Sequence, residues 1–217
     1  MKERNVTITL SKAREWFNSG DATLREVALQ AFDKTELMLN FTDIKTFQDA
    51  CKALKLNYGV MLSIVNAIKQ VSRASAAMFK LNIIKKALNL NQDLHLTKNQ
   101  KGSYIYYPCN PFVTESSTYY VSNLNSGKME IIGKIRSEGT LYNVLGGSAY
   151  DGGYAGLGVF YSSDGTGYAD AHAGFLGCAS KEIAQHFGKY FGMLITEAKY
   201  ASMIKDFEII ESKYATI

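Results

Sequence analysis

The stretch Gly146–Ser180 is built from a restricted set of amino acids, and this set constrains what the chain can fold into. Gly, Ala, Ser, Thr, Tyr, Phe, Asp, His, Leu, Val and Cys occur in it, whereas Lys, Arg, Glu, Gln, Asn, Pro, Met, Ile and Trp do not. Gly permits backbone angles that other residues avoid, and Tyr offers a large amphipathic surface with few rotamers to order. The composition predicts either an exposed contact surface or short strands joined by tight turns in an ordinary β domain.

The same stretch has a second compositional property, at the level of codons. Each of its amino acid types can be reached from an Asn codon by changing adenines alone, and Asn itself is absent. This pattern suggests diversification targeted to adenine positions. A framework of fixed residues separates the unusual positions: Gly146-Gly147-Ser148, Gly153, Ala155-Gly156-Leu157, Phe160, Gly174-Phe175 and Cys178.

This framework resembles the variable region of the target proteins of diversity-generating retroelements. The resemblance implies a C-type-lectin-like domain whose mutated positions expose side chains that bind a partner. Ala149 stands where the family prefers Trp, and Leu176 stands where it has Arg. A predicted helix also follows the closing strand, so the last third of the chain is expected to be a complete lectin fold or a reduced relative.

Three segments near the N-terminus resemble a helical leader found ahead of varied domains in proteins of Bacteroidales bacteria and their phages. They are Ile8–Gly20, Leu29–Phe32 and Thr46–Leu54. The resemblance implies an attachment or assembly module without active-site residues. We therefore expect the chain to come from a Bacteroidales phage or prophage.

Local patterns predict an α+β fold with two domains. Residues 1–91 are expected to form a small α-helical bundle for attachment or assembly, and residues 92–217 a β-rich, C-type-lectin-like ligand-display domain with a C-terminal helix. The predicted helices cover 12–18 after Ser11 as N-cap, a segment after Asp21 as N-cap, 46–54 with a near capping box of Thr46 and Asp49, 58–71, 74–90 and 180–205. The predicted strands cover 94–97, 104–107, 117–121, 128–136, 142–145, 157–161, 174–178 and 207–211, and residues 6–10 are expected to form a short strand or an extended arm.

Two side-chain patterns make these predictions more specific. In the C-terminal helix, Phe187, Phe191, Leu194 and Ala198 form an apolar side, and Gly188 and Gly192 permit a close backbone approach. The alternation of apolar and polar residues is imperfect from residue 129 to 134, which indicates a strand covered on both faces.

Bulk properties exclude several classes of protein. The chain has 217 residues, 47% of them hydrophobic, and a net charge of +4 that is spread along the sequence. Because there is no basic arm or stripe, we expect no nucleic acid partner. The beginning of the chain is too short and too polar for a signal peptide, and no apolar run is long enough to span a membrane, so we expect no membrane insertion. We expect synthesis in the host cytoplasm, no cofactor and no metal.

Three groups of residues leave chemical alternatives open. Cys178 with His172 and His186 suggests a cysteine nucleophile, although Cys51, Cys109 and Cys178 also read as reduced core thiols. The loop aspartates of the predicted ligand site suggest calcium, but they lack the spacing and the number of oxygens that calcium requires. Lysines 80, 85 and 86 indicate a phosphate-binding face or a solvated helix face.

The leading interpretation is a non-enzymatic binding protein on the virion surface, displaying a hypervariable surface to a host cell-surface protein or glycan. Its expected ligand-binding residues are Tyr150, Asp151, Tyr154, Tyr161, Asp164, Tyr168, Asp170 and His172. Because single contacts of this kind are weak, we expect a homo-oligomer, with a trimer favoured, bound to other virion proteins. The alternatives are a structural phage protein (capsid decoration, head fibre or tail component) whose Gly-rich region packs subunits, and a small hydrolase using Cys178.

Overall fold

The computed structural model describes residues 7–38, 40–89, 104–108, 110, 112–118, 121–127, 129–147, 158–161 and 176–214. The chain is a mixed α+β protein, as predicted. Its internal contacts divide it into two compact units, Met1–Asn40 and Phe41–Ile217. The predicted domain boundary between residues 91 and 92 lies outside the described residues. The functional division into 1–91 and 92–217 stays a prediction.

The first unit is made of three short helices around a small apolar cluster. These are α1 (Leu10–Asn18), α2 (Ala22–Ala31) and α3 (Lys34–Leu37). Ala13, Ala28 and Leu37 form the buried centre, and Trp16 packs against it. Asp21 caps α2 as predicted, because its carboxylate accepts hydrogen bonds from the backbone N–H groups of Thr23 at 2.8 Å and Leu24 at 3.1 Å.

The beginning of this unit differs from the prediction. Residues 7–9 belong to no strand and α1 starts at Leu10, so the short strand expected at residues 6–10 is wrong. The extended arm, the alternative for these residues, agrees with the extended backbone of Thr9. The predicted cap, Ser11, is also wrong: Thr9 caps α1 by accepting a hydrogen bond from the N–H of Lys12 at 3.3 Å. Ser and Thr are both good N-caps, and the earlier start places Leu10 in the helix, where it packs against the apolar cluster.

The helical part of the second unit follows the predicted pattern closely. It comprises the 3-10 helix η1 (Phe41–Asp43), α4 (Phe47–Ala53), α5 (Tyr58–Val71) and α6 (Arg73–Leu88). The capping box of α4 is confirmed: the N–H of Thr46 donates to the Asp49 carboxylate at 2.9 Å, and the N–H of Asp49 donates to the Thr46 hydroxyl at 3.1 Å. The bounds of α5 are those predicted.

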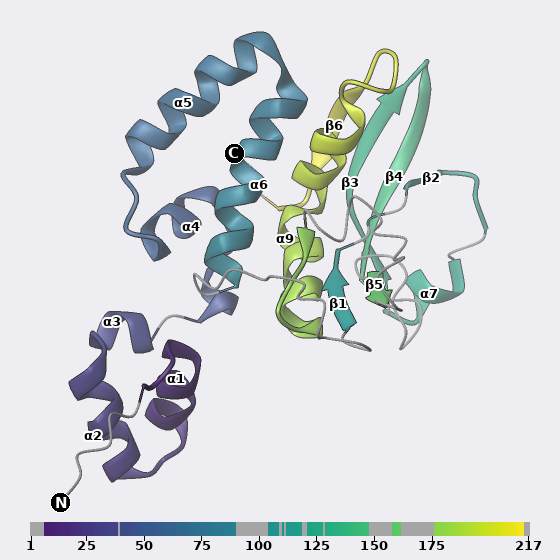
Figure 1. Ribbon diagram of the computed structural model, residues 1–217. Helices are drawn as coiled ribbons and strands as arrows, with labels where there is room; N and C mark the ends of the chain where they lie inside the picture. The colour runs from purple at the N-terminus through teal and green to yellow at the C-terminus, as the bar shows by residue number, and fades with distance from the viewer. Residues whose placement is uncertain are drawn as a thin grey trace, which may run out of the picture. The chain divides into compact units, whose positions relative to one another are not determined.

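The strands of the second unit form two antiparallel sheets (Figure 1). The elements of this part are β1 (Tyr104–Tyr107), β2 (Phe112–Thr114), α7 (Val121–Asn125), β3 (Met129–Ser137), β4 (Thr140–Gly147), β5 (Gly158–Tyr161) and β6 (Glu208–Ser212). The larger sheet has the order β2-β4-β3-β6, and the smaller pairs β1 with β5. The C-terminal strand therefore returns to the sheet, as predicted.

Two strand predictions are wrong. No strand covers the described residues between 117 and 121, because α7 begins at Val121. The N–H of Val121 donates to the carbonyl of Thr118 at 3.2 Å, which closes a turn. A local turn thus satisfies the backbone that a strand would have paired with a neighbour. Of the strand predicted at 174–178, residues 176–178 are described: Leu176 is helical, and Cys178 makes an isolated bridge. The strand predicted at 94–97 lies outside the described residues.

The imperfect alternation in β3 has a different cause from the predicted one. The pairing of β3 with β4 shifts between Ile131 and Gly133, which is a β-bulge. The extra residue reverses the faces of the strand. Ile131 is consequently 38% exposed, whereas Ile132 and Ile135 are fully buried. The strand is therefore not covered on both faces along its whole length.

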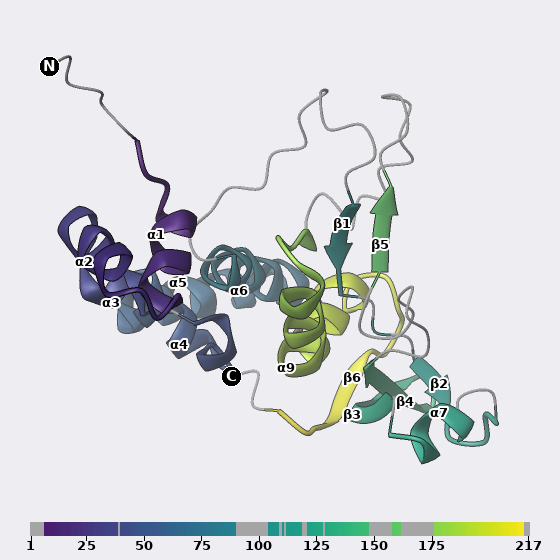
Figure 2. The same cartoon turned by 90° about the horizontal axis from the view of Figure 1, so that it is seen from below.

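Helix α9 (Lys181–Tyr200) lies between α6 and the larger sheet, as both views show (Figures 1 and 2). Its predicted apolar side is buried: Phe187, Phe191, Leu194 and Ala198 pack in one cluster with residues of α4, α5 and α6. Met193 packs in a second cluster with Ile132, Ile135 and Val144 of the sheet. α9 thus joins the helical layer to the sheet.

The predicted close approach at Gly192 is confirmed. A Cβ atom there would overlap the Cδ1 atom of Ile132 and lie 2.6 Å from the Nδ2 atom of Asn110. Real Cβ atoms do not approach other atoms this closely, so a residue with a Cβ would force Ile132, Asn110 or α9 itself to shift in the packed core.

We predict opposite effects for two Gly→Ala substitutions in helices. Gly192→Ala should lower the free energy of unfolding by about 2 kcal/mol, because overpacking outweighs the higher helix propensity of Ala. Gly59→Ala is the matched control: it lies in α5, and a Cβ there would meet only the side chain of Asn57, at 3.4 Å. It should leave stability unchanged or raise it by up to about 1 kcal/mol. Urea denaturation measures both, and equal effects would contradict the close-packing argument.

Candidate functional site

The best candidate for a functional site is the frame that holds the Gly-rich stretch. The stretch leaves the larger sheet at the end of β4, contributes β5, and returns to the core ahead of α9. In the smaller sheet, Tyr161 of β5 lies opposite Tyr104 of β1, and Gly158 lies opposite Tyr107. Residues 148–157 and 162–175, on either side of β5, lie outside the described residues.

A buried asparagine, Asn110, holds the backbone at the point where the Gly-rich stretch leaves β4. Its side chain is 6% exposed, and its Nδ2 atom donates to the carbonyl of Leu145 in β4 at 3.0 Å and to that of Gly188 in α9 at 3.1 Å. Gly146 follows in close contact with Ile132, since a Cβ at Gly146 would lie 2.6 Å from the Cγ2 atom of Ile132. The end of β4 is thus bonded to α9 and packed against β3.

A second buried asparagine, Asn89, holds the backbone at the point where the Gly-rich stretch returns to the core ahead of α9. It directly follows α6 and is 3% exposed. Its Nδ2 atom donates to the carbonyls of Lys85 at 3.0 Å and Gly177 at 3.1 Å, and its Oδ1 atom accepts from the N–H of Ala179 at 2.8 Å. The NH2 group and the carbonyl oxygen of the side-chain amide therefore both bind the returning backbone, and the NH2 group also binds the end of α6.

Apolar contacts support the same end of the stretch. Leu176 is 1% exposed and Cys178 is 2% exposed, and both belong to the cluster that contains Phe187 of α9. Ser180 then caps α9, as predicted, by accepting a hydrogen bond from the N–H of Ile183 at 3.3 Å. Both ends of the stretch are therefore rigidly held.

Most of the predicted ligand-binding residues lie outside the described residues: Tyr150, Asp151, Tyr154, Asp164, Tyr168, Asp170 and His172. Tyr161 is placed by its backbone in β5. The anchoring roles of Asn89 and Asn110 were not predicted from the sequence. An Asn at the end of a helical pattern marks a C-cap, and this signal was available for Asn89. Asn110 stands between Pro108 and Pro111, which indicate a turn but not a buried amide.

Cys178 does not have the environment of a nucleophile. Burial raises the pKa of its thiol strongly, and this outweighs the opposing effect of the charge on Lys85. The Sγ atom lies 3.3 Å from the carbonyl oxygen of Leu176, to which the thiol donates. A nucleophilic cysteine needs a stabilised thiolate. The buried, unpaired thiols expected for Cys51 and Cys178 are confirmed, and Cys109 lies outside the described residues.

His186 is also a buried residue of the core, and its hydrogen bond goes to a backbone carbonyl. It is 9% exposed, and its Nε2 atom lies 2.7 Å from the carbonyl oxygen of Ile44, to which it donates. The ring packs edge-on against Phe41 and at 4.5 Å from the ring centre of Tyr190. Burial lowers the pKa of His186 below its usual 6.5, so the neutral ring is favoured.

A polar cluster at the start of β3 holds the segment after β6. Glu130 pairs with Lys213, accepts hydrogen bonds from the hydroxyl of Tyr214 at 3.1 Å, and lies 3.5 Å from the Nζ atom of Lys189. Burial alone would raise the pKa of Glu130, but the hydrogen bonds from Lys213 and Tyr214 and the charge of Lys189 lower it overall. The cluster explains how the chain is fixed to the sheet beyond its last strand.

The described residues offer no group of three or more His, Cys, Asp or Glu side chains that could hold a metal ion. Asp151, Asp164 and Asp170, the three residues of the calcium alternative, are outside this part of the chain. Among the described helices, none is both long and apolar enough to cross a membrane. Comparisons of the chain with protein-family models, curated proteins and solved structures find no match.

We predict that Asn89→Asp destabilises the protein by about 2 kcal/mol, because a carboxylate oxygen replaces the amide that donates to two buried carbonyls. Asn82→Asp is the matched control, since Asn82 is an exposed asparagine of α6, the helix that Asn89 caps. That substitution should change stability by no more than about 0.5 kcal/mol. Chemical denaturation of both variants at neutral pH makes the comparison, and similar losses would show that Asn89 does not anchor the stretch.

We predict that His186 makes the protein less stable as the pH falls. The lowered pKa means that the unfolded chain takes up the proton first, near pH 6.5, and so unfolding is favoured from there down to the pKa of the folded state. His186→Gln keeps an N–H donor for the carbonyl of Ile44 but does not titrate. Its free energy of unfolding should decline less than that of the wild type between about pH 7.5 and 5.5. Parallel slopes for the two proteins would exclude His186 as the cause.

Proposed function

We propose that this protein is a non-enzymatic binding protein that displays residues 148–175 to a ligand. The observation that carries the proposal is the anchoring of both ends of the stretch, by Asn110 on one side and Asn89 on the other. A binding loop gains affinity when its ends are preorganised, because less ordering remains to be done on binding. The Tyr-, Ser-, Gly- and Asp-rich composition of the stretch is that of adaptable contact surfaces.

We further propose that the ligand is a host cell-surface protein or glycan and that the protein acts on the surface of a phage particle. The resemblance of the Gly-rich framework to retroelement targets supports a C-type-lectin-like display domain. The resemblance of the N-terminal segments to phage-associated leaders supports attachment to other virion proteins. Display in several copies on a homo-oligomer would compensate for weak single contacts.

A structural phage protein is the second candidate. In that case, the tyrosines of the Gly-rich stretch would be buried between subunits instead of facing a ligand. The two candidates differ in what mutation of these tyrosines does to assembly. A hydrolase using Cys178 is disfavoured by the raised pKa and the burial of its thiol.

We predict that replacing Tyr150, Tyr154 and Tyr168 together by Ala weakens ligand binding but preserves the fold. Loss of aromatic contact residues should weaken binding by at least about tenfold. The measurement is the binding of labelled protein to a panel of Bacteroidales strains and to a glycan array, with the thermal unfolding midpoint and the oligomer mass as controls. Unaltered binding would exclude these rings as the contact surface, and loss of the oligomer would favour the structural candidate.

The proposed diversification has a separate test in the neighbouring DNA. We expect a near-copy of the region that encodes residues 146–178, with Asn codons at the variable positions, next to a reverse transcriptase gene. Sequencing of the locus settles this point. Absence of the copy would remove the retroelement part of the proposal and leave ligand display to be judged by the tyrosine variant.

A further inference from the structure

The turn that ends α4 places two leucines beside α6. Lys55 adopts a left-handed backbone conformation with φ 57°, and the N–H of Leu56 donates to the carbonyl of Cys51 at 2.8 Å. The N–H of Lys55 donates to the carbonyl of Lys52 at 3.1 Å. These two hydrogen bonds form a Schellman motif, which closes a helix and fixes the direction of the chain that follows. Leu54 and Leu56 are therefore held in place on either side of Lys55.

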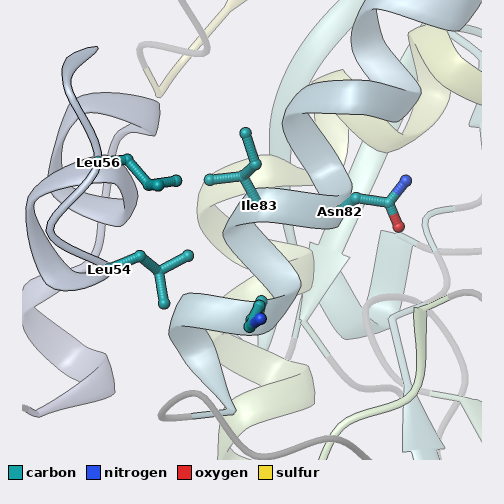
Figure 3. Close-up of a pocket in the computed structure, with 5 residues that line it drawn as sticks. Leu54, Leu56, Asn82 and Ile83 are labelled. Atoms are coloured by element: carbon teal, nitrogen blue, oxygen red, sulfur yellow. The ribbon is translucent and has the colours of Figure 1, made fainter. Parts of the chain in front are cut away.

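A pocket with an apolar interior lies between this turn and the side of α6. Its volume is about 440 Å³, and it is lined by Leu54, Leu56, Asn82, Ile83 and Lys86. Figure 3 shows Leu54 and Leu56 directed toward α6 and Ile83 directed back toward them. Asn82 points away from the two leucines in the same view. Leu54 and Ile83 also pack against the hydrophobic cluster that α9 shares with α4, α5 and α6, so both walls of the pocket are anchored in the core.

One positive charge belongs to the lining of this pocket. Lys86 is exposed, and its side chain forms no hydrogen bond or ion pair with the residues that the structure describes. Ligand pockets of this size are lined mainly by apolar side chains, and a small number of polar groups orient the ligand in them. An ammonium group beside three aliphatic side chains therefore suits a ligand that combines an apolar chain with a negatively charged end.

We propose that this pocket binds a small aliphatic carboxylate, with its chain among Leu54, Leu56 and Ile83 and its carboxylate at Lys86. A partner helix needs apolar contacts along several turns, whereas the lining uses little more than one turn of α6. A membrane surface takes up protruding apolar residues, whereas these three side chains enclose a hollow. The site lies outside the Gly-rich stretch, so the proposal does not depend on ligand display by that stretch.

The first test titrates the full-length protein with octanoate and with its uncharged counterpart, octanol, and follows binding by NMR chemical shifts. Lys86→Gln should weaken octanoate binding by about fivefold, the loss expected for an exposed ion pair, and should leave octanol binding unchanged. Lys69→Gln is the matched control, because it removes an exposed lysine of α5 outside the lining and should change neither affinity. Equal octanoate affinities of the Lys86 variant and the wild type would overturn the proposal.

A second variant tests the apolar part of the pocket. Leu56→Ser should weaken the binding of octanoate and octanol alike, by at least about fivefold, because apolar contact area is lost. Leu56 is 37% exposed, so circular dichroism should show an unchanged fold. Val71→Ser is the matched control, since Val71 is 89% exposed and lies outside the lining. Similar affinities of the two variants would mean that the leucine does not line the binding site.

A series of carboxylates from butanoate to decanoate separates a bounded pocket from an open apolar surface. Affinity should rise by up to about fourfold with each added CH2 group and level off once the chain fills the pocket. A rise without a plateau would overturn the proposal. Sedimentation with vesicles that contain about 20% phosphatidylserine, without saturable octanoate binding, would also overturn it in favour of a membrane surface. Failure here leaves ligand display intact, because the tyrosine variant tests a different part of the chain.

Discussion

The burial of α9 between α6 and the larger sheet is the interaction on which the second unit depends. Phe187 and Phe191 fill one side of this contact, and Met193 fills the other. A helix buried on two sides needs its own polar groups satisfied, and the hydroxyl of Thr196 donates to the carbonyl of Gly192 at 2.9 Å. The arginine side chain of the ion pair between Arg73 and Glu197 is about half exposed, so water screens the pair and apolar packing contributes more to stability.

The structural features that could be predicted from the sequence are those that depend on residues close together in the chain. Asp21, the Thr46–Asp49 box and Ser180 cap helices through hydrogen bonds that span no more than three residues, and each was recognisable from residue type and spacing. The apolar side of α9 and the close approach at Gly192 could likewise be predicted, because helical periodicity marks the face that must be buried.

What could not be predicted depends on contacts between distant residues. Asn89 meets Gly177, 88 residues away, and Asn110 meets Gly188, 78 residues away. Neither partner is visible from local pattern. The bulge at Ile131–Gly133 and the helix at Val121 show the same limit, since strand pairing depends on a partner strand that the local sequence does not specify. Of the candidate site, the sequence identified the stretch but not the two amides that hold it.

Asn110 and Asn89 form hydrogen bonds with main-chain atoms: the carbonyl oxygens of Leu145 and Gly177, and the N–H of Ala179. Every amino acid offers the same carbonyl, and all but proline offer the same N–H. These hydrogen bonds therefore do not depend on which side chains the residues between the two anchors carry. In the proposed ligand display, exchange of those side chains would change what the protein recognises and leave both sets of main-chain hydrogen bonds in place. One framework would in this way carry many different sequences between the same two anchors.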